Sequence, residues 1–482
     1  MSTPGSLQRM DLTSGPILRT LLVFSVPTLA SNLLQSLNGT VNAIWVGRLL
    51  GEAALAATAN SNIVMFLVFA GVFGFGMAAT VKVGQAFGAK RIDAARRTFG
   101  TAIGFCGVLA VAVAATGWIF APQLLHLLAT PGESYALALA YLRIIFLSMP
   151  AGMMTIIIAM GLGGSGDSRT PALFMLLSVM LDVALNPLLI AGIGPFPRLG
   201  IAGSALATAT ATYVTLFALV GWLYWKDLPL RLRGAELRYL VPARSELGYI
   251  LGKGLPMGAQ MLLVSSAGIA MVGLVNREGL LATAAYGASM QLWSYLQMPA
   301  MAISGGVSAM AAQAIGAGLH HRLEATTRAG LLANFAMTGL LTVLLLAFDR
   351  PLLVLFLGPD SPAVPLARHI QLLASWSFVL FGMTIMFFGT MRAGGAVIAP
   401  LVVLAISLFP VRLGFVFGAR DWLGQDALWL AFPVGSLAAV LLSWIAYRRP
   451  GWRESARAVP ATEAAEESQA DGEPAGRMAP NI

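Results

Sequence analysis

Long apolar runs recur along almost the whole chain, and they constrain its fold more than any other feature. Hydrophobic residues make up 57% of the 482 residues and charged residues only 11%, whereas a soluble domain carries about 25% charged residues. A helix crosses a bilayer when about 20 successive residues are apolar. The chain is therefore predicted to be an all-α integral membrane protein in the lipid bilayer, because a β-barrel would show short alternating segments. Twelve spans are expected, at residues 17–46, 54–82, 98–121, 135–161, 171–192, 200–225, 248–276, 282–318, 329–348, 365–391, 397–418 and 426–447.

The second half of the chain repeats motifs of the first half. VPTLASNLLQ begins at Val26 and LPMGAQMLLV at Leu255, an offset of 229 residues, while GQAFGA at Gly84 matches AQAIGA at Ala312 at an offset of 228. An ordered series of matches at a nearly constant offset indicates an internal duplication. Two pseudo-symmetric lobes of six helices are therefore predicted, and transport sites lie between or within such halves near the midplane.

The polar segment 226–247 is the longest internal connection, and it divides the chain. We expect an N-lobe at 1–225, a C-lobe at 248–449 and a disordered cytoplasmic tail at 450–482, which is rich in Ala, Glu, Pro and Ser. Most of the 30 lysines and arginines lie in this connection, in the tail and in the loops of the same side. Because basic residues gather in cytoplasmic loops, both termini are expected in the cytoplasm, with the protein in the plasma (inner) membrane.

One carboxylate, Asp182, lies in the middle of the apolar stretch 173–190. Burying a charge at that depth costs at least ~2.5 kcal/mol, so the side chain should face a cavity or a partner rather than lipid. Asn186 lies one turn away on the same face. Asp182 is the first candidate for coupling a proton or cation to transport. The alternative is a structural carboxylate, paired with Asn186, with a backbone group or with an arginine. The mid-span arginines are Arg143 and Arg412, and Arg412 lies near the repeat-related position in the other half.

Other polar side chains are candidates for contact with substrate. Gln35, Asn38 and Asn42 share one face of the first span, although hydrogen bonding between spans would equally account for them. Aromatic faces suit organic cations, but Trp and Tyr also gather at the membrane interface. The candidates around the seventh and eighth spans are Gln260, Tyr286, Gln291, Trp293 and Tyr295.

The remaining composition argues against an enzyme, a metal protein and a nucleic-acid binder. The single cysteine, Cys106, excludes an intrachain disulfide and a cysteine metal cluster, and the four histidines form no metal-ligand pattern. An integral-membrane enzyme would need a catalytic cluster in its spans. The net charge of +9 follows from basic loops that direct membrane insertion. No cofactor, no metal and no nucleic-acid partner are expected.

Several ordered motifs resemble the MATE family, the multidrug and toxic compound extrusion transporters. They are VPTLASNLLQSLNGTVNAIWVGRLLGEAALAA, GQAFGAKR, GLGGSGDSRTPALFMLLSVMLDVALNPLLI and GIAGSALATATA. The resemblance covers residues 15–447. It implies secondary antiport, in which a small amphiphilic or cationic substrate leaves the cell as H⁺ or Na⁺ enters. It also implies a V-shaped arrangement of two lobes that alternate access, and a monomer is expected.

The resemblance also implies a cation-coupling site in the N-lobe. Members with such a site have an Asp in the first span, an Asn and an Asp one turn apart in the fifth, and a Thr in the sixth. The corresponding residues here are Asn42, Asp182, Asn186 and Thr208. The first-span Asp is thus replaced by an amide, and the acid and amide of the fifth span are exchanged. One carboxylate remains, so the coupling ion and its stoichiometry stay open.

Some members instead hold an acidic cation site in the C-lobe. The expected seventh and tenth spans, 248–276 and 365–391, contain no Asp or Glu, so that site is not expected here. A second transport hypothesis is a flippase for lipid-linked precursors, of a related two-lobed exporter type. Such a protein would need several cationic residues facing its central cavity, and Arg143 and Arg412 are the mid-span candidates.

Overall fold

The computed structural model describes residues 11–127, 132–194, 196–454 and 456–457, and within these ranges it consists of helices and loops. Twelve helical stretches are long and apolar enough to cross a membrane, which confirms the predicted all-α fold class. The elements are α1 (Ile17–Leu50), α2 (Glu52–Gly88), α3 (Ile92–Leu127), α4 (Gly132–Gly164), α5 (Arg169–Ala191), α6 (Ile201–Trp225), η1 (Gly234–Leu240), α7 (Arg244–Asn276), α8 (Leu280–Gly316), α9 (His321–Ala347), α10 (Asp349–Leu357), α11 (Ala363–Ala374), α12 (Ser377–Ala393), α13 (Ile398–Ile406), η2 (Ser407–Leu413), α14 (Gly414–Leu423) and α15 (Asp426–Arg448).

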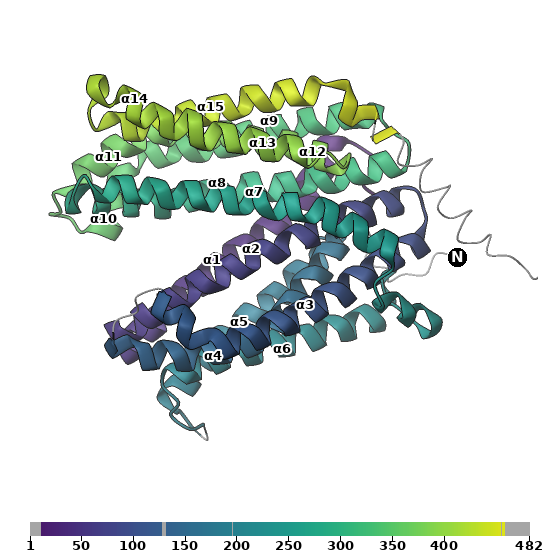
Figure 1. The fold of residues 1–482 in the computed structure, drawn as a ribbon, viewed down its shortest axis with the longest axis horizontal. Coiled ribbons are helices and arrows are strands. Elements are labelled where there is room, and N and C mark those ends of the chain that lie inside the picture. The colour runs from purple at the N-terminus through teal and green to yellow at the C-terminus, as the bar shows by residue number, and fades with distance from the viewer. Residues whose placement is uncertain (1–10, 128–131, 195, 455, 458–482) are drawn as a thin grey trace, which may run out of the picture.

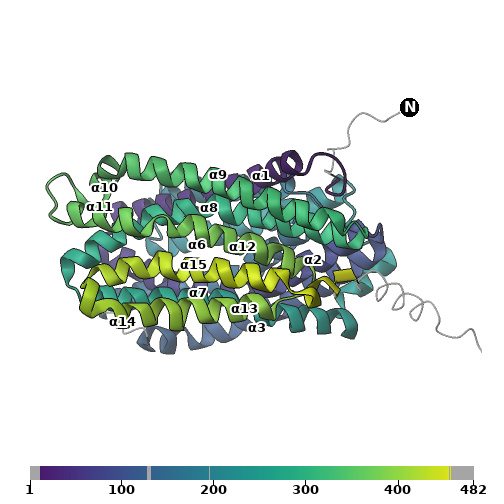
Figure 2. The same cartoon turned by 90° about the horizontal axis from the view of Figure 1, so that it is seen from above.

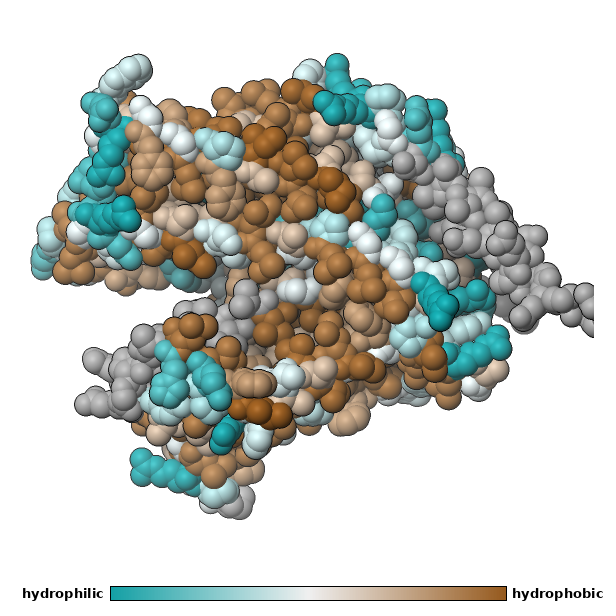
Figure 3. All heavy atoms as spheres, in the orientation of Figure 1, coloured by the Kyte–Doolittle hydropathy of each residue, from teal (hydrophilic) through white to brown (hydrophobic). Residues whose placement is uncertain are grey.

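The helices form two lobes arranged as a V. In Figure 1 the helices α1 to α6 make the lower lobe and α7 to α15 the upper one. The lobes meet at the end where α1 begins and α15 ends, which we call the termini side, and they separate toward the opposite end. The space-filling view shows an open cleft between the lobes at that opposite end (Figure 3). Seen from above, the long helices of the C-lobe run along the same long axis (Figure 2).

Glycines allow the two lobes to pack closely. Both α1 and α2 of the N-lobe contact α8 of the C-lobe, and α2 also lies along α7. A Cβ atom at Gly74 of α2 would lie 2.3 Å from the carbonyl oxygen of Gly254 and 2.4 Å from the backbone nitrogen of Gly258, both on α7. Only small residues permit such an approach of two helix backbones inside a membrane. These glycines therefore set the distance between the lobes.

Several helices extend beyond the apolar runs that predict them. The third span was expected from residue 98, yet α3 begins at Ile92. Its polar first turns lie against the connection between the lobes, where Arg96 donates to a Glu236 carboxylate oxygen at 2.6 Å and to the carbonyl oxygen of Pro229 at 2.6 Å. The connection is thus packed on α3 through the 3₁₀ turn η1, and the helix is stabilised where the apolar pattern has stopped.

The start of the C-terminal tail is also packed. Residues 450–454 are helical, although disorder was expected from residue 450. The Trp452 side chain is buried, and its Nε1 donates to the Tyr447 carbonyl oxygen at 2.7 Å. Burial of the Trp452 ring therefore keeps this segment helical although its composition is polar. Residues 458–482, the rest of the predicted tail, lie outside the described residues.

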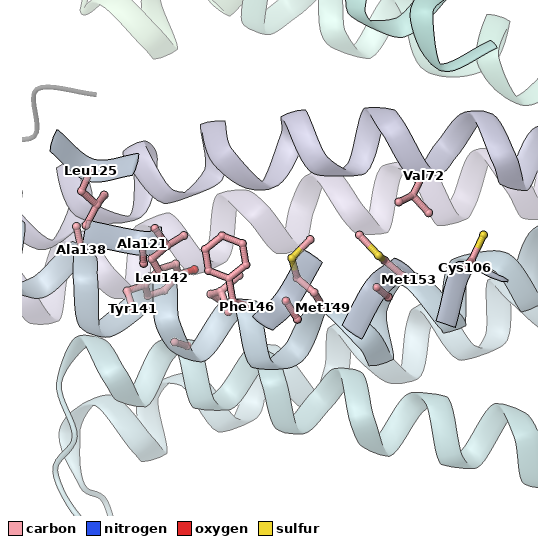
Figure 4. Packing of buried hydrophobic residues seen from close by; sticks show 14 of the residues in the cluster. Val72, Cys106, Ala121, Leu125, Ala138, Tyr141, Leu142, Phe146, Met149 and Met153 are labelled. Atoms are coloured by element: carbon pink, nitrogen blue, oxygen red, sulfur yellow. The ribbon is translucent and has the colours of Figure 1, made fainter. Parts of the chain in front are cut away.

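The core of the N-lobe holds α4 in place beside the candidate site. Figure 4 shows Phe146, Met149 and Met153 of α4 in the apolar cluster, with Tyr141 on the same helix. A Cβ atom at Gly117 of α3 would lie 2.1 Å from the Phe146 ring, so α3 and α4 are in direct contact. This packing fixes the position of Tyr141 within the N-lobe.

Candidate functional site

Asp182 lies in the middle of α5, and its side chain is buried in the N-lobe at 2% exposure. Thr208 Oγ1 on α6 donates a hydrogen bond to Asp182 Oδ1 at 2.9 Å. Asn186 Nδ2, one turn further along α5, donates to the same oxygen at 3.2 Å. The Asn38 side chain of α1 lies close enough to interact with this carboxyl group. Two helices, α5 and α6, therefore supply donors that replace water around the carboxylate, and α1 lies beside them.

A second set of polar groups continues the site toward α1 and α4. Asn42 Oδ1 on α1 accepts a hydrogen bond from Ser204 Oγ on α6 at 3.0 Å. The Tyr141 side chain on α4 lies close enough to Asn42 and to Asp182 to interact with both. The structure thus brings all four residues of the predicted coupling set together, as well as Asn38.

Sequence reasoning missed two members of this cluster. Ser204 lies one turn before Thr208 on α6, and this i, i+4 spacing could have signalled it. Tyr141 had no such signal, because it is one aromatic residue in the apolar helix α4. Its contact with the site depends on how α4 packs against α6 and α5.

No lysine, arginine or histidine in the described parts of the chain forms an ion pair with Asp182. The two arginines that could have neutralised it lie elsewhere. The Arg143 guanidinium lies 4.8 Å from the centre of the Trp118 ring, and that of Arg412 lies 3.6 Å from the centre of the Phe432 ring. The carboxylate of Asp182 is therefore held by neutral donors.

Two oxygen atoms beside the carboxylate are buried without a hydrogen-bond partner, Asn38 Oδ1 and Asn186 Oδ1. Buried acceptors are usually hydrogen-bonded, so these two oxygens can each accept a further donor or contact a cation. The site therefore holds one carboxylate and two free amide oxygens that a bound proton or sodium ion would satisfy. No group of three or more His, Cys, Asp or Glu side chains gathers within the described residues.

The predicted substrate-contact residues fall into two groups by exposure. Gln35 on α1 and Gln291 on α8 are exposed, and Tyr295 is partly buried. By contrast, Gln260 is buried and donates through Nε2 to the Val397 carbonyl oxygen at 3.1 Å. In this conformation the structure does not bring these C-lobe residues to the cluster around Asp182.

Tyr286 and Trp293 belong to an aromatic cluster inside the C-lobe. Their rings are 5.9 Å apart between centres, and both pack against Phe432. Trp293 Nε1 donates to Gln371 Oε1 at 2.8 Å. Exposure of 4% for Tyr286 and 2% for Trp293 means that their ring faces are already occupied by protein.

Two repeated six-span halves with an unneutralised carboxylate at mid-membrane define a membrane transporter of the two-lobed class. The family model described as MatE matches the chain twice, at residues 27–188 and 256–417, once in each lobe. The chain therefore belongs to the MATE family. Members of this family are transporters, so the chain is a transporter and not an enzyme.

Individual relatives cover nearly the whole chain. It is 35% identical to "Probable multidrug resistance protein YoeA" of Bacillus subtilis over 89% of this chain and 93% of the relative. It is 28% identical to a protein named "FAD transporter" of Shewanella oneidensis, over 89% of this chain and 94% of that one. A crystal structure of the Vibrio cholerae MATE transporter VcmN matches with a TM-score of 0.84 at 20% identity, over 91% of this chain and 98% of that one. This structural likeness shows the shared fold.

Proposed function

We propose that this transporter exports small amphiphilic or cationic drugs across the plasma membrane, in exchange for H⁺ or Na⁺ that binds at Asp182. The observation that carries the proposal is the buried Asp182 carboxylate, which has neutral donors and no ion-pair partner among the described residues. An intramembrane acid of this kind marks an ion pathway in transporters. The name of the Bacillus subtilis relative, a probable multidrug resistance protein, supports drugs as the cargo.

The proposed orientation places both termini in the cytoplasm, as the distribution of basic residues favours. The termini side then faces the cytoplasm, and the cleft in Figure 3 opens to the outside. In this state an ion from outside would reach Asp182 after the cargo has left. The protein is proposed to work as a monomer, since each chain carries both lobes.

The coupling mechanism follows from the position of α1. This helix supplies Asn38 to the carboxyl group of Asp182, and it also contacts α8 and α9 of the C-lobe. Binding of H⁺ or Na⁺ changes the charge that Asn38, Asn186 and Thr208 surround. The changed hydrogen bonds move α1 relative to α5 and α6, and thereby favour one of two lobe arrangements over the other. A ligand shifts such an equilibrium only by its difference in affinity for the two states.

The test is export of a fluorescent organic cation from proteoliposomes by the parent and by Asp182→Asn. An imposed pH gradient without sodium, and a sodium gradient at constant pH, separate the two coupling ions. We expect one gradient to drive export in the parent and neither in the variant, while the variant still binds the dye. Asp360→Asn, at an exposed position, is the matched control and should behave as the parent. Export by Asp182→Asn at the parent rate would make this carboxylate structural.

A flippase for lipid-linked precursors remains the second candidate. It would require a set of cationic side chains facing the cleft to hold a diphosphate. The mid-span arginines Arg143 and Arg412 instead lie over aromatic rings inside separate lobes, so no specific observation favours this alternative.

A further inference from the structure

The turn between α12 and α13 is a point on the termini side where the C-lobe offers backbone acceptors to other helices. The Ala393 carbonyl oxygen, at its start, accepts a hydrogen bond from Gln85 Nε2 of the N-lobe at 2.7 Å. The Gly395 carbonyl oxygen accepts from Lys253 Nζ of α7 at 2.7 Å. The position of this turn therefore decides whether the bond from Gln85 across the lobe boundary can form.

Two glycines, Gly394 and Gly395, form the turn. Gly395 has a φ of 79°, a left-handed conformation that glycine adopts without steric cost. Glycine also has more backbone freedom than any other residue, so the turn does not hold its own position rigidly. What packs against the turn must therefore help to place the Ala393 carbonyl.

The start of the C-terminal tail packs on this turn. Residues 450–454 and 456–457, which we call the docked segment, are helical. A Cβ atom at Gly394 would lie 3.1 Å from Trp452 Cε3 and 3.2 Å from Ala456 Cβ. Trp452 and Ala456 are buried, at 7% and 0% exposure. The docked segment thus fills the space directly beside the glycines.

A chain of hydrogen bonds joins the docked segment to three helices of the C-lobe. Trp452 Nε1 donates to the Tyr447 carbonyl oxygen of α15 at 2.7 Å, and the two rings lie 5.2 Å apart between centres. The Tyr447 hydroxyl donates to Thr327 Oγ1 of α9 at 3.2 Å. Thr327 Oγ1 in turn shares a hydrogen bond with Thr390 Oγ1, in the last turn of α12, at 2.8 Å. The segment is therefore fixed to the same helix end that carries Ala393.

The apolar cluster around the docked segment includes both lobes. Trp452 and Ala456 belong to one cluster of buried residues with Met391 and Ala393 of α12 and with Val81 of α2. Burial of apolar side chains in such a cluster stabilises the arrangement that buries them. Because α2 belongs to the N-lobe, this cluster exists in its present form only while the lobes are together on the termini side.

The N-lobe has a matching arrangement. Gly164, which ends α4 and lies 229 residues before Ala393, accepts a hydrogen bond from Gln313 Nε2. The segment that follows α6 packs Leu228 into a buried cluster with Leu162, two residues before that end of α4. In each lobe, residues after the last long helix thus support the helix end that offers a carbonyl to the other lobe.

We propose that the docked segment is a clasp that favours the lobe arrangement closed on the termini side. It packs on Gly394 and holds the α12–α13 turn where the Ala393 carbonyl meets Gln85. When the segment leaves, the glycine turn relaxes, the bond from Gln85 weakens and the termini side opens more readily. The equilibrium shifts by the difference between the contacts that the segment makes in the two arrangements. The tail thereby regulates the change between lobe arrangements, whichever cargo and ion the transporter carries.

Distances between spin labels on the purified full-length protein test the clasp. Cysteines introduced at Lys90 of the N-lobe and Ala325 of the C-lobe, both exposed, carry the labels and report the closed and open populations. We expect Trp452→Ala to raise the ratio of open to closed protein about fivefold or more. Trp444→Ala, at a 43% exposed position of α15, is the matched control and should leave the ratio unchanged.

A double variant shows whether the segment acts through the bond from Gln85. In Gln85→Leu the donor to Ala393 is already gone. Adding Trp452→Ala to this variant should therefore change the ratio by less than about twofold. Two independent effects on the lobe equilibrium would multiply instead.

A second variant serves if Trp452→Ala does not fold. Ala456→Glu places a charge against Gly394 while the Trp452 ring remains, and it should raise the ratio in the same direction. Its control is Glu454→Ala, at an exposed position of the same segment. An unchanged ratio in the folded variants, even with a lower melting temperature, would overturn the clasp. So would effects of Trp452→Ala and Gln85→Leu that multiply in the double variant.

Discussion

Gln85 and Gln313 hold the two lobes together by the same contact made in opposite directions. Gln85 Nε2 of the N-lobe donates to the Ala393 carbonyl oxygen of the C-lobe at 2.7 Å, and Gln313 Nε2 of the C-lobe donates to the Gly164 carbonyl oxygen of the N-lobe at 2.9 Å. Both glutamines are buried, at 2% and 5% exposure. Because each acceptor is the last residue of its helix, each bond satisfies a carbonyl that has no partner within the helix. The pair closes the termini side of the V.

Loss of both bonds should open the termini side. Each buried hydrogen bond contributes about 1 kcal/mol net, so Gln85→Leu with Gln313→Leu should shift the equilibrium between lobe arrangements roughly 30-fold. Spin labels on cysteines introduced at the exposed positions Lys90 and His321 would report this as a population at longer distance. The native Cys106 is fully buried and should not take up label.

The matched control for this pair is Gln123→Leu, at an exposed position on α3. It changes the same side chain without touching the lobe boundary and should leave the distance distribution unchanged. An unaltered distribution in the double variant would show that the glutamines do not hold the closed state.

Gly74→Ala should destabilise the packing of α2 on α7. The new Cβ would lie 2.3 Å from the Gly254 carbonyl oxygen, and backbone on both sides leaves no flexible side chain to move away. Overpacking of this kind costs about 1–3 kcal/mol, so the melting temperature in detergent should fall. Gly71→Ala on the same helix is the control, because no atom lies within 4 Å of its built Cβ. Equal melting temperatures for the two variants would contradict the close approach.

The Lys82–Glu246 ion pair links α2 and α7 across the lobe boundary. Its N–O distance is 3.2 Å, its side chains are 11% and 9% exposed, and Thr98 Oγ1 donates to the same carboxylate at 2.7 Å. Glu246→Gln leaves Lys82 unpaired and should cost about 3–5 kcal/mol of stability. The double variant Lys82→Met with Glu246→Leu should recover most of it, as apolar replacements of buried pairs do. Thermal unfolding of both variants measures the difference, and no recovery would mean that the pair itself stabilises the contact.

His320 makes stability depend on pH at the termini side. It lies between α8 and α9, where burial and the positive charge of Arg457 lower the pKa of its imidazole. The unfolded chain takes up this proton near pH ~6.5, whereas the folded chain does so only at lower pH. The stability contributed by the neutral His320 imidazole is therefore complete above about pH 6.5, the pKa of the unfolded chain. It is lost as the pH falls from there toward the lower pKa of the folded chain. The melting temperature should drop less in His320→Gln than in the parent between about pH 7.5 and about pH 5.5, and His321→Gln should follow the parent.

The fold was predictable because the bilayer dictates how long an apolar helix must be. The apolar runs predict the number of spans. The motif offset of 229 between Val26 and Leu255 indicates that the second half of the chain duplicates the first. Helix ends were less predictable, because they depend on contacts outside the membrane. Arg96 bound to Glu236 extends α3, and buried Trp452 orders the start of the tail.

The site was predictable only where its residues share one helix or a family motif. Asp182 and Asn186 are one turn apart on α5, and the resemblance supplied Thr208. Tyr141 reaches the site by packing between helices, and no local spacing in the sequence encodes that contact.

Thr208→Val should weaken ion coupling without abolishing it. The substitution keeps the shape of the side chain and removes the hydrogen bond to Asp182 Oδ1 at 2.9 Å, which leaves the carboxylate with its amide donors. A hydrogen bond to a charged group contributes about 1.5–3 kcal/mol, so the ion concentration for half-maximal export should change by roughly tenfold or more. Thr212→Val, one turn further along α6, removes only a bond to its own helix at the Thr208 carbonyl oxygen and should leave coupling intact. Equal effects of the two variants would assign the loss to the helix rather than to the bond with Asp182.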